Sequence, residues 1–441
     1  MSETAAPRVE VVPATRPAIP SNVAPGPDRG HEADRLHSAL SRVLGPSWRL
    51  ELWDGRVVAH GDADFVFRIC APRGVDSMLS GVPEKAFGRA YVAGLVEVEP
   101  LEPFLRAMAT AGLSRLVRAW PHIAAALLGL GGRPRLGAAS AAEARLRGRR
   151  HSRQRDAEAI RHHYDLPPEF YALWLGASMT YSCAYFESAD ISLDAAQRAK
   201  LDLVCRKLRL QSGERLLDIG AGFGSLVMHA AEHYGVTAVG ITLSAAQAAY
   251  AQEQIRERGL AGRAEVRLAD YRDDNGRFDA VASVGMVEHV GRKRLGTYSD
   301  AVFGALRPGG RALIHGITRS PSGIWNRASF NDAFVFPDGE LEDIGLMVRA
   351  YERAGLEVRD VESLREHYAL TLGHWSQRLD ERWRDAIGLA GQERARVWRL
   401  YMRGSAMSFS LGFLNIHQTL AVRPAGDGRS GIPLSRRDWY R

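Results

Sequence analysis

A glycine-rich turn in the middle of the chain is the feature best suited to hold a ligand. The stretch LDIGAGFGSL places Gly220, Gly222 and Gly224 between an apolar, strand-like run and the start of a helical pattern. Glycine at these positions lets the backbone come close to a bound molecule at a helix N-terminus. The pattern predicts a site for a nucleotide-like ligand, although a purely structural glycine turn can have the same spacing.

Two residues near this turn narrow the choice of ligand. Asp218 lies inside the strand, before the first glycine, where its carboxylate could meet a ligand amine. The next strand ends in Thr242, whereas a nicotinamide site would have an Asp or Glu there to bind the ribose. A carboxylate beside the turn suits a zwitterionic ligand, such as S-adenosylmethionine, better than a dinucleotide.

The elements around the turn alternate between strands and helices. Strands are predicted at ERLLDIG, VTAVGIT, AEVRLAD, FDAVASVG and GGRALIHGI, with helices after Gly224 and in SAAQAAYAQEQIRERG. This alternation predicts an α/β domain with a doubly wound, mostly parallel sheet. Ligands of such sheets bind at the carboxyl ends of the strands, where His315 closes the fifth predicted strand.

Composition divides the 441-residue chain into four parts. Residues 1–34 contain six prolines and few large apolar residues, which predicts disorder. Residues 35–130 read as a small α+β domain, because LELWDGRVVAHG and ADFVFRICA alternate like strands and a helix, a short strand and a second helix follow. Residues 131–156 form an arginine-rich linker, and residues 157–441 form the domain that holds the glycine turn.

The formal net charge of +7 is concentrated in one segment. Residues 133–155 hold eight arginines and one glutamate, a difference that equals the whole excess. Such a segment can be a solvated linker, can hold an anionic bilayer, or can bind nucleic acid. In the membrane interpretation, the neighbouring apolar stretch 113–130 would insert shallowly, with Trp120 near the headgroups.

The cysteines and the apolar segments indicate a compartment. Cys70, Cys183 and Cys205 show neither a pairing pattern nor a metal-ligand cluster, which favours a reducing, cytoplasmic setting without a bound metal. The N-terminal residues lack the apolar core of a signal peptide. The longest apolar stretch, 123–132, is far short of the ~20 residues that span a bilayer. We expect a cytoplasmic protein that contacts the inner face of the membrane peripherally.

The larger domain resembles the cyclopropane-fatty-acid-phospholipid synthase family of S-adenosylmethionine-dependent methyltransferases, a family that includes the mycolic acid cyclopropane synthases. The stretches that carry the resemblance are HYDLPPEFYALWLGASMTYSCAYFE, LDIGAGFGSL, GITLSAAQAAYA, SVGMVEHVG, FVFPDGEL and LNIHQ. They cover about residues 160–425, and AFGRAYVAGLVEVE extends the likeness more weakly into the N-terminal domain. The resemblance implies a Rossmann-like class I methyltransferase fold, with a small N-terminal domain for lipid access.

The resemblance also carries the methyl-donor site onto this chain. The implied donor-binding residues are Tyr181, Ser182, Asp218, Gly220, Gly222, Gly224, Thr242, Gln247, Tyr271 and Arg272. The last two follow the third predicted strand, where the adenine should lie. Three departures are visible. Ala221 and Phe223 stand where Cys and Trp are common, and Ser405 stands where some relatives have Cys, so we expect no essential thiol there.

The chemistry of the family requires a base. Methylation of an unactivated alkene leaves a carbocation, which must lose a proton before a ring can close. The resemblance assigns that proton to a bound bicarbonate ion, and its ligands map to Cys183, Glu288, His315, Ile317 through its backbone, and Tyr368. An alkene offers no electrophile to a cysteine, so we interpret Cys183 as a ligand or wall. Aromatic faces stabilise cations, and seven aromatic residues between 164 and 186 could supply such walls or pack the core.

We therefore expect an enzyme that converts the cis double bond of an unsaturated phospholipid acyl chain into a cyclopropane. Alternatives remain open: a methylene- or methyl-branched product made with a partner reductase, or methylation of a small molecule. DLPPEF does not match the motif of a nucleic-acid amino-methyltransferase, because Leu166 precedes the prolines and Glu169 follows them, so we expect no nucleic-acid partner. The oligomeric state is also open, with a homodimer as one alternative.

Overall fold

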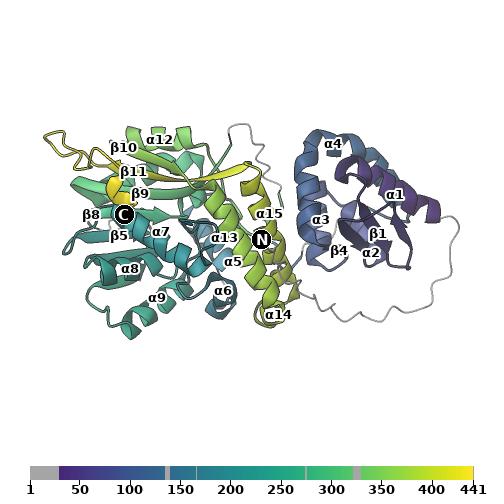
Figure 1. Ribbon diagram of the computed structural model, residues 1–441, viewed down its shortest axis with the longest axis horizontal. Coiled ribbons are helices and arrows are strands. Elements are labelled where there is room, and N and C mark those ends of the chain that lie inside the picture. Colours follow the sequence, from purple (N-terminus) through teal and green to yellow (C-terminus); the bar gives the residue numbers. More distant parts are fainter. Residues whose placement is uncertain (1–28, 135–139, 165, 274–275, 321–328, 441) are drawn as a thin grey trace, which may run out of the picture.

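The protein is described by a computed structural model of residues 29–134, 140–164, 166–273, 276–320 and 329–440. Figure 1 shows two bodies along its long axis. The smaller, N-terminal body is purple to blue, and the larger body runs from teal to yellow.

The larger body is built on a seven-stranded sheet with the order β10-β11-β9-β8-β5-β6-β7. Its strands are β5 (Arg215–Ile219), β6 (Thr237–Thr242), β7 (Ala264–Leu268), β8 (Phe278–Val284), β9 (Leu306–Arg319), β10 (Glu357–Ser363) and β11 (Leu414–Val422). β11 is antiparallel to both β9 and β10, and the other neighbours pair in parallel. The predicted α/β fold with a mostly parallel sheet is confirmed.

Helices cover both faces of this sheet, which is why the inner strands are apolar on both sides. One face packs against α7 (Leu193–Lys207), α8 (Ser225–His233) and α9 (Ala245–Glu257). The other packs against α10 (Leu295–Ala305) and α12 (Ile344–Arg353). Side chains alternate along a strand, so Leu216 joins the first layer and Leu217 the second. Two short 3₁₀ turns, η1 (Val287–His289) and η2 (Arg292–Arg294), follow β8.

A helical layer lies beside the glycine turn. Its members are α5 (Arg153–Tyr164), α6 (Pro168–Leu175), α11 (Phe330–Phe334), α13 (Arg365–Glu381), α14 (Trp383–Ala390) and α15 (Gln392–Ser410), and η3 (Arg437–Trp439) lies near the chain end. Aromatic rings hold the layer together: Trp174 lies 5.4 Å from Trp375 and 5.3 Å from Trp398, centroid to centroid. The Tyr171 ring contacts Phe223 of the glycine loop at 5.4 Å, which ties this layer to the sheet edge.

The N-terminal body is a four-stranded sheet with helices on it. Its elements are α1 (Arg29–Leu44), β1 (Trp48–Leu52), β2 (Val57–Ala59), β3 (Phe65–Ile69), α2 (Pro72–Met78), α3 (Pro83–Val92), β4 (Val96–Glu99) and α4 (Leu101–Gly129). The strand order is β2-β1-β3-β4, and β1 and β2 form the antiparallel hairpin expected at WDGR. The helix, strand and helix predicted after it are α3, β4 and α4, and this order is confirmed.

One expectation for this region needs correction. α1 begins at Arg29, so residues 29–34 are helical rather than disordered, and residues 1–28 lie outside the described residues. One side of the apolar stretch 113–130 packs the domain core, because Ile123, Leu127 and Leu130 are at most 3% exposed and α4 packs on α1. Val117 and Leu128 of the same helix are 61% and 50% exposed, so shallow insertion of this stretch into a membrane stays a prediction. None of the helices in the described part of the chain has the length and apolar character needed to cross a bilayer.

The arginine-rich segment attaches to the larger body. Arg150 forms ion pairs with Asp338 and Glu340, and Arg155, which lies in α5, pairs with Asp338. Residues 135–139 lie outside the described residues. Helix α5 begins at Arg153, inside the segment expected to be a linker, and its later residues Ala159 and His163 are buried.

One buried arginine joins the two bodies. Arg396 of α15 is 5% exposed and reaches across to the N-terminal body. Its guanidinium donates to the carbonyl oxygens of Tyr91, at 2.5 Å, and Val96, at 3.1 Å, and to the carboxylate of Glu97 at 2.5 Å. It also lies 4.3 Å from the Tyr91 ring centroid. One side chain therefore satisfies three acceptors at the boundary between the bodies.

The Arg396→Met variant tests this contact. It keeps much of the side-chain volume but removes the guanidinium from the Val96 carbonyl and the Glu97 carboxylate, and it leaves the Tyr91 carbonyl with only the Gly94 N–H. We therefore expect a loss of about 2–3 kcal/mol in the free energy of unfolding. Chemical denaturation measures this loss. Arg382→Met is the control, because Arg382 is 57% exposed and pairs with Asp385, three residues away in sequence. Equal unfolding midpoints for the two variants would contradict the role given to Arg396.

Candidate active site

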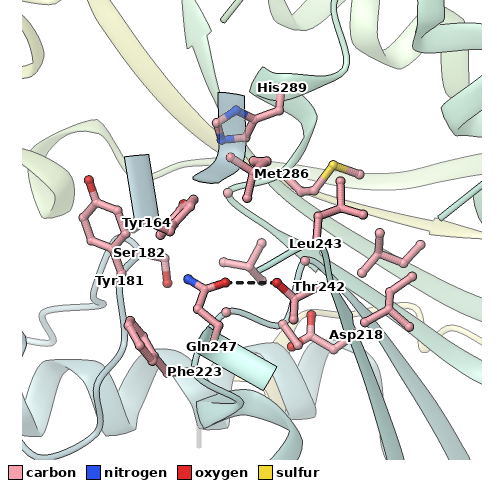
Figure 2. Close-up of a pocket in the computed structure, with 18 of the residues that line it drawn as sticks. Tyr164, Tyr181, Ser182, Asp218, Phe223, Thr242, Leu243, Gln247, Met286 and His289 are labelled. Atoms are coloured by element: carbon pink, nitrogen blue, oxygen red, sulfur yellow. Dashed lines mark hydrogen bonds between the residues drawn. The ribbon is translucent and has the colours of Figure 1, made fainter. Parts of the chain in front are cut away.

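A cavity opens at the carboxyl ends of β5, β6 and β8 (Figure 2). Nine of the ten predicted donor-binding residues line it: Tyr181, Ser182, Asp218, Gly220, Gly222, Thr242, Gln247, Tyr271 and Arg272. Tyr164, His289 and Met286 complete parts of the wall, and Figure 2 shows His289 and Met286 at the top of the view, Tyr164 near Tyr181, and Phe223 at the lower left. We call this space the donor cavity.

The glycine loop forms the floor of the donor cavity, and its glycines differ in what they do. Gly222 has φ +55°, and a Cβ added there would meet nothing closer than the Gln247 amide nitrogen at 4.0 Å. Gly224 has φ +81° and does not line the cavity; its Cβ would meet Ala251 at 2.9 Å. Gly222 therefore keeps space open for a ligand, whereas Gly224 lets α8 begin close to α9.

The end of β6 presents an amide to the cavity. The Thr242 hydroxyl donates to the Gln247 side-chain oxygen at 3.0 Å. This bond orients the amide so that its nitrogen points away from Thr242, toward Ser182 and Tyr181, as Figure 2 shows. Gln247 is 4% exposed and lines the cavity, so its amide N–H groups are placed to bond a ligand there.

Asp218 is a buried carboxylate that lacks a counterpart. It is 3% exposed, and its Oδ1 has no hydrogen-bond partner among the described residues. Burial raises the pKa of this carboxyl to about 7. A ligand ammonium would supply the missing donor, as expected from the sequence. Lys200 of α7 also lines the cavity, and sequence reasoning missed it.

Tyr271 and Arg272 follow β7, as the sequence indicated. Arg272 bonds Asp270 through its main chain and its guanidinium, and it pairs with Asp156 at 3.1 Å. These contacts fix the Arg272 side chain. It forms part of the cavity wall, and its guanidinium already bonds the Asp270 and Asp156 carboxylates.

A second cavity adjoins the first and contains all five predicted catalytic residues. Cys183, Glu288, His315, Ile317 and Tyr368 line it. The two cavities share wall residues, which are Tyr164, Tyr181, Ser182, Val284, Gly285 and His289. Apolar side chains from α13, α15 and β11 form much of the rest, including Leu372, Phe409, Leu414 and Ile416. We call this space the acyl cavity.

Glu288 is buried at the edge between the cavities. It lies in η1, and its Oε1 accepts the backbone N–H of Ile317 at 2.5 Å. Its Oε2 has no partner among the described residues, and burial raises the carboxyl pKa to about 7. The Ile317 N–H thus already donates to Glu288. The backbone carbonyl of Ile317 is the main-chain group of this residue that could bind a ligand.

His315 presents a defined nitrogen to the acyl cavity. The Lys207 ammonium can only donate hydrogen bonds, so the Gln418 atom that it contacts at 2.8 Å must be the side-chain oxygen. The Gln418 amide nitrogen therefore faces His315 Nδ1, 3.4 Å away. Nδ1 must then be the acceptor, and the ring proton lies on Nε2. Burial lowers the pKa of His315, so the ring is neutral. Its Nε2 has no partner among the described residues and faces the acyl cavity.

Cys183 behaves as a wall. It is fully buried, burial raises the pKa of its thiol, and its Sγ donates to the Ala184 carbonyl at 3.2 Å. A protonated, hydrogen-bonded thiol is a poor nucleophile. Of the seven aromatic residues from 164 to 186, only Tyr164 and Tyr181 line both cavities, whereas Phe170, Tyr171 and Trp174 pack the core. Tyr401, which sequence reasoning missed, also lines the acyl cavity.

Comparison of the sequence with known proteins identifies the family of this chain. A model of the mycolic acid cyclopropane synthetase family matches residues 151–419. The chain belongs to this family. It is therefore an S-adenosylmethionine-dependent methyltransferase of the cyclopropane synthase type.

The relatives fall into two groups by coverage. A probable fatty acid methyltransferase of Pseudomonas putida is 39% identical over 400 residues, which cover 89% of this chain and 96% of that protein. Cyclopropane mycolic acid synthase 1 of Mycobacterium tuberculosis is 36% identical over 271 residues, 59% of this chain and 94% of that protein. The first group thus matches the N-terminal body as well.

Solved structures agree with the methyltransferase domain. The cyclopropane synthase MmaA2 from Mycobacterium tuberculosis has a TM-score of 0.58 and 34% identity, over 60% of this chain and 98% of that one. The mycolic acid cyclopropane synthase CmaA1, solved with S-adenosylhomocysteine and CTAB, has a TM-score of 0.57 and 33% identity, over 60% and 97%.

The Gly222→Val variant tests the donor cavity. The valine side chain would project into the space that Gly222 leaves open, so we expect S-adenosylmethionine binding to be lost in a folded protein. Titration calorimetry measures the affinity. Gly259→Val is the matched control, because Gly259 has a similar φ of +66°, has open space around it and lies outside both cavities. Wild-type affinity in the Gly222 variant would exclude the assignment.

Proposed function

We propose that this enzyme transfers a methyl group from S-adenosylmethionine to the cis double bond of an unsaturated phospholipid acyl chain and gives a cyclopropane. The observation that supports the proposal is the acyl cavity, an apolar space that shares part of its wall with the donor cavity and holds two buried polar atoms without partners among the described residues. The apolar part would take the acyl chain. The polar atoms would bind the group that accepts the leaving proton.

The residues of the acyl cavity suit a cationic reaction path. S-adenosylmethionine supplies an electrophilic methyl group, and its transfer to an alkene leaves positive charge on the acyl chain. Tyr164, Tyr181, Tyr368 and Tyr401 surround the cavity and would place electron-rich faces around that charge. The apolar walls exclude water, which would otherwise capture a carbocation.

The base for the last step is proposed to be bicarbonate, and the cavity residues fit it. Glu288 Oε2 can accept a hydrogen bond from the hydroxyl of such an ion, and His315 Nε2–H can donate one to its oxygens. Both atoms lack partners among the described residues. The Tyr368 hydroxyl would donate a further hydrogen bond to the oxygens of the ion. Cys183, whose thiol proton goes to Ala184, would line the site, and the Ile317 carbonyl would accept the hydroxyl proton of the ion only in place of Glu288. Bicarbonate would supply the acceptor for the proton that leaves the new methyl group.

A second product is favoured by one observation. The relatives that align with 88–89% of this chain are named probable fatty acid methyltransferases, whereas the cyclopropane synthases align with 59–60%. Loss of a neighbouring proton from the same cation would give a methylene-branched chain, which a partner reductase would saturate. Mass spectrometry of lipids from an expressing host distinguishes the products, because a cyclopropane and a methylene branch have the same mass but fragment differently, and a methyl branch is two hydrogens heavier.

The Glu288→Gln variant tests the base site. It keeps the side-chain shape but removes the charge that would orient bicarbonate, so we expect turnover with an oleoyl phospholipid to fall at least ~100-fold. Donor affinity, measured by calorimetry, should persist. Glu84→Gln is the control, because Glu84 also accepts a backbone N–H, that of Phe330, but lies outside both cavities. Unchanged turnover in the Glu288 variant would reject it as a catalytic residue.

Membrane access is proposed to depend on the arginine-rich segment. Arg145, Arg147 and Arg149 are exposed, and their side chains form no ion pair with any described residue. Arg150 differs, because it is held by Asp338 and Glu340. The three free arginines, rather than the buried α4 core, would then attract anionic lipid from the surface of the enzyme.

Replacing Arg145, Arg147 and Arg149 by Gln should weaken sedimentation with phosphatidylglycerol liposomes. At about 1 kcal/mol per arginine, the loss approaches ~100-fold at low salt and shrinks as salt screens the charges. The control replaces Arg256, Arg258 and Arg267 by Gln, which removes the same charge from α9, its end and β7. If both triple variants sediment equally, the segment is not the anchor.

A further inference from the structure

The donor cavity contains a buried amine and a buried carboxyl group that form no direct contact. Lys200 is 2% exposed and Asp218 is 3% exposed, and both line the cavity. Each is near enough to shift the pKa of the other, but among the described residues Asp218 Oδ1 has no hydrogen-bond partner and Lys200 Nζ bonds the Ser182 hydroxyl. A buried charge without a counterion is costly, so each side chain is expected to meet its complement in a ligand.

The ammonium of Lys200 has donors to spare. Its Nζ donates to the Ser182 hydroxyl at 2.9 Å, which uses one of three N–H groups. Gln197, on the same helix, holds the neighbouring main chain by donating to the carbonyls of Thr180, at 3.4 Å, and Ser182, at 2.9 Å. Helix α7 therefore fixes the wall at residues 180–182 and brings Lys200 to the cavity beside it.

Groups of the chain itself supply only a partial counterion to Lys200. Cys183 is near enough to interact with Lys200, but burial raises the pKa of its thiol, so it is neutral. Burial lowers the pKa of Lys200 to about 8, which still leaves the amine mostly protonated at neutral pH. Asp218 is the only carboxylate among the residues that shift this pKa; it raises it, although its Oδ1 has no hydrogen-bond partner among the described residues.

A cation and an anion that face one cavity without pairing match the two ends of an α-amino acid. We propose that Lys200 binds the α-carboxylate of the aminoacyl end of S-adenosylmethionine, while Asp218 accepts its ammonium. This inference rests on the use of S-adenosylmethionine in the proposed function. Lys200 is then a donor-binding residue that acts on the cofactor directly, with Ser182 orienting its Nζ.

A pair of ligands that differ only in the carboxylate tests the proposal. S-adenosylhomocysteine and its decarboxylated analogue are titrated into the full-length protein by calorimetry, with wild type and the Lys200→Met variant. A charge-assisted contact supports an affinity ratio of about 100-fold for the wild type. In Lys200→Met the affinity for S-adenosylhomocysteine should fall by the same factor, and that for the analogue by less than about threefold.

The outcomes separate the proposal from simpler roles of Lys200. Equal losses for both ligands would show that Lys200 only supports the fold through Ser182, and no loss for either would show that it does not touch the ligand; both overturn the proposal. The wild-type ratio needs no variant, so a ratio near one overturns it even if Lys200→Met fails to fold. Failure of the wild type to bind either ligand would instead reject the cofactor assignment itself.

Discussion

The structure depends on one constraint: polar side chains at the carboxyl edge of the sheet are buried without a full set of hydrogen-bond partners among the described residues. Asp218 stands near the end of β5, Glu288 follows β8, and His315 lies in β9. Each lines a cavity and keeps a buried polar atom that has no partner within the described parts of the chain. A parallel sheet brings these strand ends to one edge. The helical layer of α6, α13 and α15 then covers the edge with aromatic side chains, which excludes water and makes the unpaired atoms costly until ligands complete them.

Much of this arrangement could be predicted from the sequence, because it depends on local sequence patterns. The alternation of strands and helices predicted the parallel part of the sheet, and the glycine turn predicted the donor cavity beside Asp218. The family motifs placed Cys183, Glu288, His315, Ile317 and Tyr368, which the structure gathers around one cavity although they span almost half the chain.

Some features of the site could not be predicted from the sequence, because they depend on how helices pack and on contacts between segments that are distant in the chain. Lys200 and Lys207 lie in α7, where charged residues normally face solvent, and only the packing of that helix on the sheet shows that both are buried. Gln418 lies in β11, whose antiparallel register opposite β9 places it beside His315. The apolar run in α4 is a related case: the sequence shows its hydrophobicity, but only the structure shows which of its side chains α1 covers.

The position of α15 has a mechanical consequence. Near its start, Arg396 bonds the N-terminal body, and about one and a half to three and a half turns later Tyr401, Ser405 and Phe409 line the acyl cavity. A continuous helix of 19 residues is about 28 Å long. A tilt of the N-terminal body would therefore displace the wall of the acyl cavity through this helix, so the shape of the cavity is coupled mechanically to the angle between the two bodies.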